Sequence, residues 1–361
     1  MDVARCREAR FCLPAQSPTR KGCFLASANS DIHADPAVRA EILDRAGIEL
    51  IPLGAIGSAV RGLALDTERP PSEPVRAALE HEMAVRGFLV FRSEREIDPE
   101  AFLAASCWWG GRRLHSTHGV HPATPGGNRH IFRLSNDRRH GIPGVGPQWH
   151  NDGSFLPETF SHSGYHIVRP AERGGGTHFA HQGDAHDALD PAEQERWARL
   201  VSVNSNSGVL HPLVHTHPVT GRRCVWLHLG MTGAVIERRA DGEGLRLLDE
   251  RELGDLCRRY NALLNDGFDR GYALAFEYEA NDCVFIDNLA VAHRAAPQAH
   301  ASVEEQGLRI MHRSTVQGIH PLSVSGLPSH LDMHAPSPLG EGVWQGGGIG
   351  FRWDAHAPMQ N

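Results

Sequence analysis

A histidine and an aspartate two residues apart, His150 and Asp152 in WHNDGSF, could hold a metal ion. Side chains two residues apart on an extended segment point to the same face, so an imidazole and a carboxylate would lie side by side. The triplet is weak on its own, because the chain has 24 histidines and repeats this spacing at residues 33–35 and 330–332. A single histidine is more often a surface or core side chain than a ligand. A metal site therefore needs further residues.

A third ligand is required if the metal is to activate oxygen. Two histidines and one carboxylate on one face of an octahedral ferrous ion leave the remaining positions open for reactants. His293 in DNLAVAHRAAP is the candidate, since it follows a strand that ends at Asp287 and precedes an irregular turn. Such a rim position on a rigid scaffold often carries binding residues.

Two arginines in the segment RIMHR could bind anions. Arg309, Met311 and Arg313 share one face of a predicted strand. Guanidinium groups that face a core are costly unless anions meet them. The opposite face of the strand carries a histidine and a serine, so it would pack poorly into an apolar core. The pattern is compatible with an anion site and with a solvated face, and it does not choose between them.

Short strands must position these residues. The apolar run RGFLVF at residues 86–91 is typical of a buried strand, and it follows a predicted helix at residues 74–85. Alternating apolar residues at 272–278, a turn at EAND and the strand CVFIDN together predict a hairpin. Residues 308–318 predict a further strand.

Two more helices are predicted between these strands. One begins at Asp190, with Pro191 in its first turn and Glu193 closing a capping box. The other spans residues 249–267, with an apolar stripe and Gly267 as its stop. Many short strands with few helices favour a β-sandwich or barrel core with helical insertions over a parallel α/β sheet.

The chain divides into three parts by composition. Residues 1–47 predict a flexible N-terminal extension, with a plain disordered tail favoured over an organelle transit peptide. Residues 48–320 predict one domain, in which residues 110–146 form a long loop before the metal segment. Residues 321–361 are a Pro/Gly-rich tail without clear elements.

Charge and cysteine content narrow the classes of partner. The net charge of −7, without a basic run beyond the N-terminus, indicates neither nucleic acid nor an anionic membrane as partner. No apolar run approaches the roughly 18 residues of a membrane span. Seven scattered cysteines without a C-x-x-C pair favour a reducing compartment. We expect a cytoplasmic protein, or an organellar one if a transit peptide is present, that acts on small molecules; a homo-oligomer is compatible with the sequence.

Six segments in order resemble the TauD/TfdA (taurine/aryloxyacetate dioxygenase) family of Fe(II)- and 2-oxoglutarate-dependent dioxygenases. They are RGFLVF, WHNDGSF, GGGTHFA, LHPLVHTHPVTGRRCVWLH, FIDNLAVAH and RIMHRSTVQG, and the resemblance covers about residues 48–320. The resemblance implies a mainly β fold with helical insertions around a double-stranded β-helix (jelly-roll) core. It also implies an oxidoreductase that uses Fe(II), 2-oxoglutarate and O2 and that releases succinate and CO2.

The resemblance implies roles for particular residues. His150, Asp152 and His293 would ligate iron, and Thr177 and Arg309 would bind the distal carboxylate of 2-oxoglutarate. A guanidinium fork matches a carboxylate bidentately, and a threonine hydroxyl adds one donor. The protein's task is then to position a substrate carbon at the metal.

The substrate residues follow from the same resemblance. Arg313 would pair with the acidic group of a small anionic substrate, a sulfonate or a carboxylate. His118, in the loop before the metal segment, would also contact the substrate, although this loop departs from that of taurine dioxygenase. We expect hydroxylation as the most direct outcome.

Several alternatives stay open at this point. The reaction could be catabolic, releasing sulfite or a phenol, or a biosynthetic desaturation or cyclisation. A non-catalytic 2-oxoglutarate sensor would not need the full set of metal ligands and arginine that the sequence contains, and the same holds for a non-iron jelly roll and a zinc hydrolase. A halogenase typically lacks the carboxylate ligand, which is present here as Asp152. The histidines of HPLVHTHPVTG, His211, His215 and His217, are interpreted as structural rather than as a second metal site.

Overall fold

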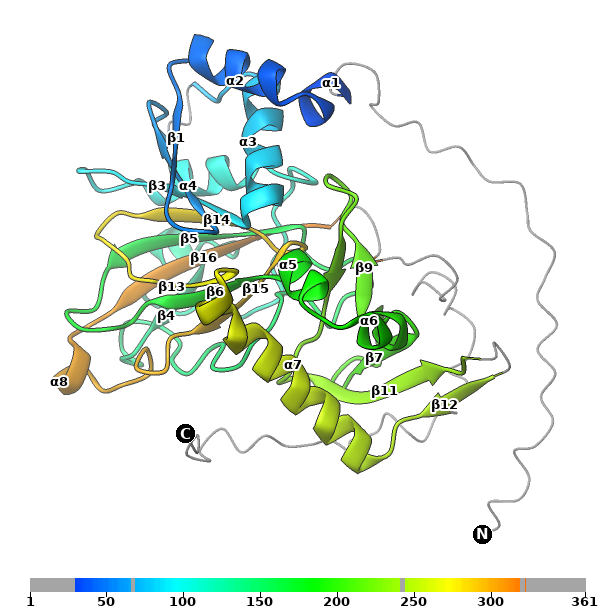
Figure 1. Cartoon of the computed structure of the whole chain (residues 1–361). Coiled ribbons are helices and arrows are strands. Elements are labelled where there is room, and N and C mark those ends of the chain that lie inside the picture. Colours follow the sequence, from blue (N-terminus) through cyan, green and yellow to red (C-terminus); the bar gives the residue numbers. More distant parts are fainter. Residues whose placement is uncertain (1–29, 66–68, 241–243, 319–321, 323–361) are drawn as a thin grey trace.

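The computed structural model describes residues 30–65, 69–240, 244–318 and 322 (Figure 1). Its largest element is a seven-stranded sheet. In spatial order the strands are β1 (Glu49–Pro52), β2 (Ser58–Arg61), β3 (Phe88–Phe91), β14 (Cys283–Asp287), β5 (His162–Arg169), β16 (Ile310–Val316) and β4 (Phe132–Ser135). All neighbours pair antiparallel except β2 and β3.

A three-stranded sheet faces the large one. It has the order β13 (Ala273–Phe276), β6 (Thr177–His181) and β15 (Val291–Ala295). Apolar residues from both sheets form one buried cluster, in which Phe88 stacks on Phe179 at 4.4 Å between ring centroids. Two antiparallel sheets around one apolar core make the jelly-roll arrangement that the sequence predicted.

Helices cover the other face of the large sheet. They are α1 (Ser30–Ala34), α2 (Pro36–Arg45), α3 (Glu73–Arg86) and α4 (Pro99–Ser106). Strand β3 serves both layers because its side chains alternate: Phe88 enters the core between the sheets, and Leu89 packs under the helices. Helices α1 and α2 lie inside the expected flexible extension, yet Ile32 and Leu43 are buried in this layer. The rest of that extension, residues 1–29, lies outside the described residues.

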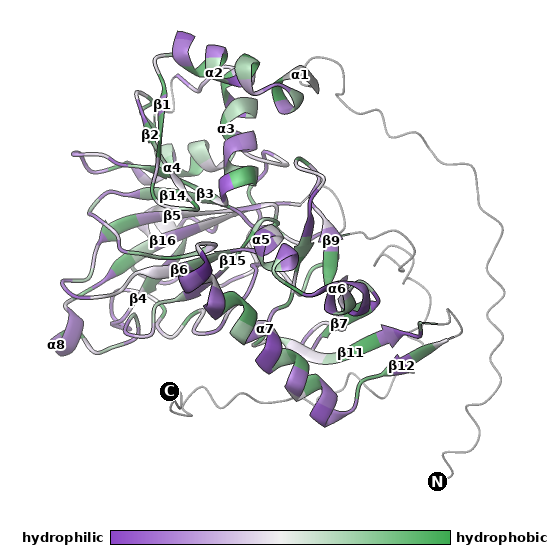
Figure 2. Ribbon diagram, in the orientation of Figure 1, coloured by the Kyte–Doolittle hydropathy of each residue, from purple (hydrophilic) through white to green (hydrophobic). Residues whose placement is uncertain are grey.

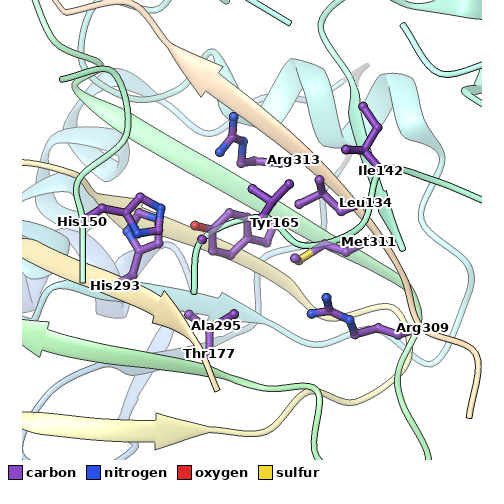
Figure 3. A pocket seen from close by; sticks show the side chains of 12 residues that line it. Leu134, Ile142, His150, Tyr165, Thr177, His293, Ala295, Arg309, Met311 and Arg313 are labelled. Atoms are coloured by element: carbon purple, nitrogen blue, oxygen red, sulfur yellow. The ribbon is translucent and has the colours of Figure 1, made fainter. Parts of the chain in front are cut away.

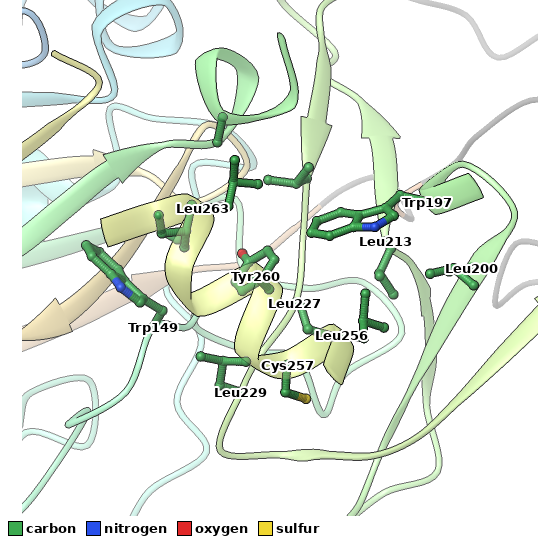
Figure 4. Close-up of a cluster of buried hydrophobic side chains, with 14 of the residues drawn as sticks. Trp149, Trp197, Leu200, Leu213, Leu227, Leu229, Leu256, Cys257, Tyr260 and Leu263 are labelled. Atoms are coloured by element: carbon green, nitrogen blue, oxygen red, sulfur yellow. The ribbon is translucent and has the colours of Figure 1, made fainter. Parts of the chain in front are cut away.

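A helix-and-sheet unit is inserted between β6 and β13. It comprises α5 (Gln182–Asp187), α6 (Pro191–Trp197), β7 (Leu200–Asn204), β8 (Leu210–Pro212), β9 (Val214–Thr216), β10 (Arg223–Val225), β11 (Thr232–Arg238), β12 (Leu245–Leu247) and α7 (Glu250–Arg270). The apolar stripe of α7, visible in Figure 2, packs into a cluster with Trp149 and Trp197 around Tyr260 (Figure 4). Trp149 precedes His150, so the insertion anchors the candidate metal segment.

Helix α7 passes the glycine that was expected to stop it. Asp249 and Glu252 form a full capping box at its start, but the helix continues to Arg270 and ends at Gly271, whose φ is 84°. Gly267 allows a close approach, since a Cβ there would lie 2.7 Å from the Tyr272 ring. The prediction of Gly267 as the stop was therefore wrong. At α6, Asp190 caps as expected, but the Glu193 carboxylate pairs with Arg259 at 2.7 Å, and no capping box is closed.

The predicted hairpin between β13 and β14 is also wrong. Strand β13 pairs with β6 in the small sheet, and β14 pairs with β3 and β5 in the large one. The chain crosses between the sheets at the turn, where Asn281 has a φ of 66°. Consecutive strands on opposite sheets are a feature of the jelly roll.

The expected loop at residues 110–146 contains regular structure. A short 3-10 turn, η2 (Pro125–Gly127), precedes β4, which pairs with β16. A last short helix, α8 (Val303–Gln306), leads into β16. Almost all of the predicted C-terminal tail lies outside the described residues. Among the described helices, none has the length and apolar character that a bilayer crossing requires.

Candidate metal centre

His150 and His293 face each other across a two-residue antiparallel bridge. The His150 N–H donates to the His293 carbonyl at 3.0 Å, and the His293 N–H donates to the His150 carbonyl at 2.9 Å. The two imidazole centroids lie 4.2 Å apart. The metal segment is thus held against the middle of β15 (Val291–Ala295) by backbone hydrogen bonds.

Asp152 completes a group of three that could hold a metal. One potential ligand atom from each of His150, Asp152 and His293 lies within 4.8 Å of the others, and all three residues are buried. Among the described residues this is the only such group, so the H-x-D spacing at residues 33–35 is no part of one. The repeat at residues 330–332 lies outside the described residues.

Side-chain amides hold the segment around Asp152. Asn288 donates through Nδ2 to the carbonyls of Asp152 and Phe160 at 2.8 and 2.7 Å, and its Oδ1 accepts from the Asp152 N–H at 2.8 Å. Asn151 Nδ2 donates to the carbonyls of Asn288 and Val291 at 2.7 and 3.0 Å. These bonds fix the irregular backbone on which the carboxylate stands.

The protonation states of the three residues suit a divalent metal. Burial lowers the pKa of His150 and His293, so both imidazoles are neutral at pH 7. Burial acts to raise the pKa of Asp152, but the Arg313 guanidinium holds it well below its usual range. His150 Nδ1 donates to the Gln148 carbonyl at 2.7 Å, which leaves Nε2 free as a ligand atom. Two neutral imidazoles and one carboxylate fit a ferrous ion.

Two neighbours orient the Asp152 carboxylate. Ser163 on β5 donates to Oδ2 at 2.8 Å, and Arg313 on β16 donates through NH1 to Oδ1 at 2.7 Å. The Arg313 guanidinium also lies 4.7 Å above the Phe132 ring. A guanidinium carries five N–H donors, so one bond to Asp152 leaves others for a ligand.

One cavity extends from the metal residues to Arg309, and we call it the Arg309 cavity (Figure 3). Arg309, Met311 and Arg313 all line it, which places the predicted arginine face of β16 inward. In Figure 3 the Tyr165 side chain lies between Arg309 and the two histidines. The other residues that line the Arg309 cavity are mostly apolar: Leu134, Ile142, Val145, Gly146 and Ala295, together with Thr177.

Thr177 and Arg309 both line this cavity. Arg309 is 8% exposed, and its NH1 donates to the Gly175 carbonyl at 3.2 Å. A side chain at Gly175 would crowd Arg309, since a Cβ there lies 3.2 Å from the Arg309 Cδ. The Tyr278 hydroxyl donates to Thr177 Oγ1 at 2.7 Å. Thr177 therefore keeps its own hydroxyl hydrogen for another acceptor.

A second cavity opens on the other side of the metal residues, and we call it the Phe160 cavity. It has a volume of about 400 Å³, within the range of small-molecule sites. His150, Asp152 and Arg313 line its metal end. The remainder is formed mainly by apolar and aromatic residues, with a few polar ones: Phe132, Val145, Pro147, Phe155, Phe160, Met231, Thr117, His118, Gln148 and His228.

Three residues of the site were missed from the sequence. The His228 ring lies 5.1 Å from the His150 ring, Tyr165 lines the Arg309 cavity, and Tyr278 contacts Thr177. His228 ends one of the quoted segments, but nothing in its spacing separates it from the other histidines. Tyr278 belonged to the expected alternation of apolar residues, which predicted burial and not a polar contact.

The histidines of HPLVHTHPVTG are buried and are not part of the metal group, although His211 Nε2 donates to the Ser154 carbonyl at 3.1 Å, two residues after Asp152. His217 Nε2 contacts Asp287 Oδ2 at 3.0 Å, so a carboxylate from a distant segment lies next to it. No second group that could hold a metal occurs among the described residues. The structural interpretation of His211, His215 and His217 stays a prediction.

The sequence of this chain is similar to a known protein family and to several known proteins. A family model described as taurine catabolism dioxygenase TauD, TfdA family, matches residues 49–315. An alpha-ketoglutarate-dependent sulfate ester dioxygenase of Pseudomonas putida is 25% identical over 310 residues, covering 76% of this chain and 90% of that protein. Pentalenolactone F synthase of Streptomyces arenae is 26% identical over 297 residues, covering 72% and 91%.

A further relative is matched over a smaller share of its own length, and two similar proteins have solved structures. An alpha-ketoglutarate-dependent sulfonate dioxygenase of Saccharomyces cerevisiae is 24% identical over 280 residues, covering 71% of this chain and 64% of that protein. A taurine dioxygenase from Burkholderia xenovorans superposes with a TM-score of 0.61 at 22% identity, covering 78% and 94%. AAD-2 in complex with Mn(II) and N-oxalylglycine superposes with a TM-score of 0.58 at 23% identity, covering 76% and 99%. These superpositions establish the fold.

Proposed function

The chain belongs to the TauD/TfdA family, and from that premise we propose that it oxidises a small organic anion where the two cavities meet. As a member of this family it is a dioxygenase that uses Fe(II), 2-oxoglutarate and O2. When bound, the iron couples decarboxylation of 2-oxoglutarate to succinate with oxidation of a substrate C–H bond. The contributions of this chain's own residues follow from the geometry.

His150, Asp152 and His293 would hold the iron, and the Arg309 cavity would hold 2-oxoglutarate. The cosubstrate is a dianion, and Arg309 with Thr177 offers a guanidinium and a hydroxyl to its distal carboxylate. The apolar wall around Met311 excludes water from that contact, which strengthens it. Tyr278 directs the Thr177 hydroxyl by occupying one of its acceptor positions.

The primary substrate would bind in the Phe160 cavity. One observation carries this assignment: that cavity opens on His150 and Asp152 and joins the Arg313 guanidinium to a largely apolar wall. A ligand with an acidic group and an apolar carbon chain or ring fits such a lining. We infer a sulfonate, sulfate ester or carboxylate, in keeping with the sulfate ester and sulfonate dioxygenases among the relatives. His118 would contact the same group from the loop.

These residues would act by positioning. Arg313 anchors the acidic group, so the carbon next to it lies nearest the metal residues and its C–H bond is the one within reach. Hydroxylation at a carbon bonded to a sulfonate sulfur or to a sulfate-ester oxygen gives an unstable product, which collapses to a carbonyl compound as it releases sulfite or sulfate. Phe155, Phe160 and Met231 cover the apolar part of the substrate and keep bulk water away.

A titration and a substrate screen test the proposal. The anaerobic protein is titrated with Fe(II) and 2-oxoglutarate, and we expect the weak visible charge-transfer band of the chelated complex. Alkyl sulfates, sulfonates and aryloxy acids are then compared by succinate release and by release of sulfate, sulfite or a phenol. Absence of the band from folded, iron-loaded protein would reject the iron site. A band without stimulation by any of these anions would reject the substrate class.

Biosynthetic tailoring is the second candidate function. The similarity to pentalenolactone F synthase, at an identity close to that of the sulfate ester dioxygenase, favours it. The same iron residues would serve, and the difference would lie in the product. Succinate release with a desaturated or cyclised product, and without loss of an inorganic anion, would select this candidate over the catabolic one.

Replacing Arg313 with alanine is expected to raise the KM of the primary substrate by about 10- to 100-fold, the cost of one charge-assisted hydrogen bond. Uncoupled 2-oxoglutarate turnover should fall less, because Ser163 still holds Asp152. Succinate formation with and without substrate measures both effects. Arg95→Ala, which removes an exposed arginine elsewhere, is the control. A variant that instead loses 2-oxoglutarate binding would mean that the two arginine roles are exchanged.

A further inference from the structure

A third cavity lies outside the two already described, and we call it the Arg129 cavity. Its volume is about 500 Å³, within the range of ligand sites. Three arginines and two histidines contribute to its lining, and no acidic residue does: Cys107, Arg112, Arg113, Leu114, His115, Ser116, Arg129, His130 and Gln317. A concave surface lined by one sign of charge attracts ions of the other sign.

Two of the arginines are not neutralised. Arg112 contacts the Glu73 carboxylate and is compensated by it. Arg113 and Arg129 form no side-chain hydrogen bond or ion pair within the described part of the chain. By contrast, Arg76 forms an ion pair with Glu73 at 2.6 Å. The cavity therefore presents two guanidinium groups that lack a counter-charge.

The two histidines are also without partners. Within the described residues neither His115 nor His130 forms a side-chain hydrogen bond, and Nδ1 of each ring is shut off from solvent. An enclosed N–H without an acceptor is costly, so the proton of each neutral ring belongs on Nε2. Each ring then offers an N–H donor rather than an acceptor to the cavity it lines.

We propose that the Arg129 cavity binds a doubly charged tetrahedral oxyanion, sulfate or phosphate, either free or as the head group of a small organic ester. Arg113 and Arg129 match the two negative charges, and a guanidinium fork suits such an oxyanion bidentately. The histidine N–H groups add donors without adding charge. The volume leaves room for an organic part next to the head group.

One segment lines both cavities: His115 and Ser116 line the Arg129 cavity, and Thr117 and His118 line the Phe160 cavity. The His115 ring packs 5.4 Å from the Phe160 ring, and Ser116 Oγ lies 3.4 Å from His118 Nε2. The Thr315 hydroxyl holds the His115 carbonyl at 2.6 Å. An oxyanion at Arg113 and Arg129 would thus occupy a place distinct from Arg313, with the His115 to His118 segment between them.

Calorimetric titration of the full chain tests the proposal, and no turnover is needed. The probes are inorganic sulfate, inorganic phosphate and phenyl phosphate in a chloride buffer. We expect at least about tenfold weaker binding in Arg113→Gln/Arg129→Gln than in the parent, since each contact is a charge-assisted hydrogen bond. Arg95→Gln, with the same loss of charge at an exposed position, should bind as the parent does. Equal binding of all probes identifies a free oxyanion, and preference for phenyl phosphate identifies an ester.

The active-site arginine separates this site from the catalytic one. Arg313→Gln should leave oxyanion binding within about twofold, because that residue lines the other two cavities. Loss of binding in Arg313→Gln with retention in the double variant would overturn the proposal, and so would absence of binding to the parent protein at millimolar probe. Arg113 and Arg129 are exposed, so the double variant should keep its thermal unfolding midpoint. If the unfolding midpoint of the double variant falls, the single variant Arg129→Gln is titrated in its place.

Discussion

Replacing Asp152 with alanine is expected to lower 2-oxoglutarate turnover by at least roughly 100-fold, since even residues that only support metal ligands cost 10- to 100-fold when removed. Asp152 supplies the one carboxylate of the group, and its loss leaves two imidazoles. It also leaves the Arg313 guanidinium without the acceptor that it contacts at 2.7 Å. Succinate formation and Fe(II) affinity are the measurements.

Folding must be separated from chemistry in that variant, because removing one partner of a buried charge pair costs about 3–5 kcal/mol. Asp152→Asn is the companion, since its amide oxygen still accepts from Arg313 while the negative charge is lost. Ser163→Ala is the milder control, because it removes only the 2.8 Å bond to Oδ2. We expect the order of activity Ser163→Ala, Asp152→Asn, Asp152→Ala, from highest to lowest. Full activity in Asp152→Ala would move the metal elsewhere.

The local part of the metal site could be predicted from the sequence. The spacing of His150 and Asp152 predicted that both side chains face one site, and they do, although Asp152 lies in a turn and not in the expected extended segment. His293 stood out because it follows a strand at a rim. Their meeting could not be derived in the same way. It depends on the backbone bridge between His150 and His293, which joins residues 143 positions apart (293 minus 150). No periodicity within either segment encodes that bridge.

Strands were easier to predict than their partners. The alternation in β13 and the apolar run of β14 indicated strands correctly, but their pairing with different sheets is a property of the whole fold. Helices α1 and α2 were missed because their burial is slight: Ile32 and Leu43 enter the core while most of their neighbours stay exposed. A short helix of that kind carries little amphipathic signal.

Contacts between polar side chains were the least predictable part. The face of β16 with Arg309, Met311 and Arg313 was recognisable as a pattern, although the pattern left its orientation open. The bond from Arg313 to Asp152 gives that arginine a second task beside the proposed substrate contact. The bond from Tyr278 to Thr177 arises between β6 and the end of the neighbouring β13 segment, so only the assembled small sheet produces it.

Arg309→Ala is expected to raise the KM for 2-oxoglutarate by about 100-fold, the upper end of what a charge-assisted contact contributes. Arg309 is buried at the end of a cavity whose wall is mostly apolar. Among the described residues, Arg313 is the only other arginine that lines this cavity, and it lies at the metal end (Figure 3). A carboxylate at the Arg309 end would therefore lose its guanidinium partner in the variant. The affinity for Fe(II) should change little, because Arg309 contacts none of the three metal residues. Succinate formation across a range of 2-oxoglutarate concentrations measures the effect.

Tyr278→Phe tests the proposed contact between Thr177 and the distal carboxylate indirectly, through the partner of Thr177. It deletes the hydroxyl that donates to Thr177 at 2.7 Å, so the Thr177 hydroxyl is no longer directed toward the cavity. The phenyl ring keeps the packing, and we therefore expect a rise in the KM for 2-oxoglutarate of only about fivefold, in line with one neutral hydrogen bond. A larger rise for Arg309→Ala than for Tyr278→Phe, with the primary substrate KM unchanged in both, would place the distal carboxylate at Thr177 and Arg309. If the substrate KM rose instead, the Arg309 cavity would hold the substrate and the two cavities would have to exchange their proposed ligands.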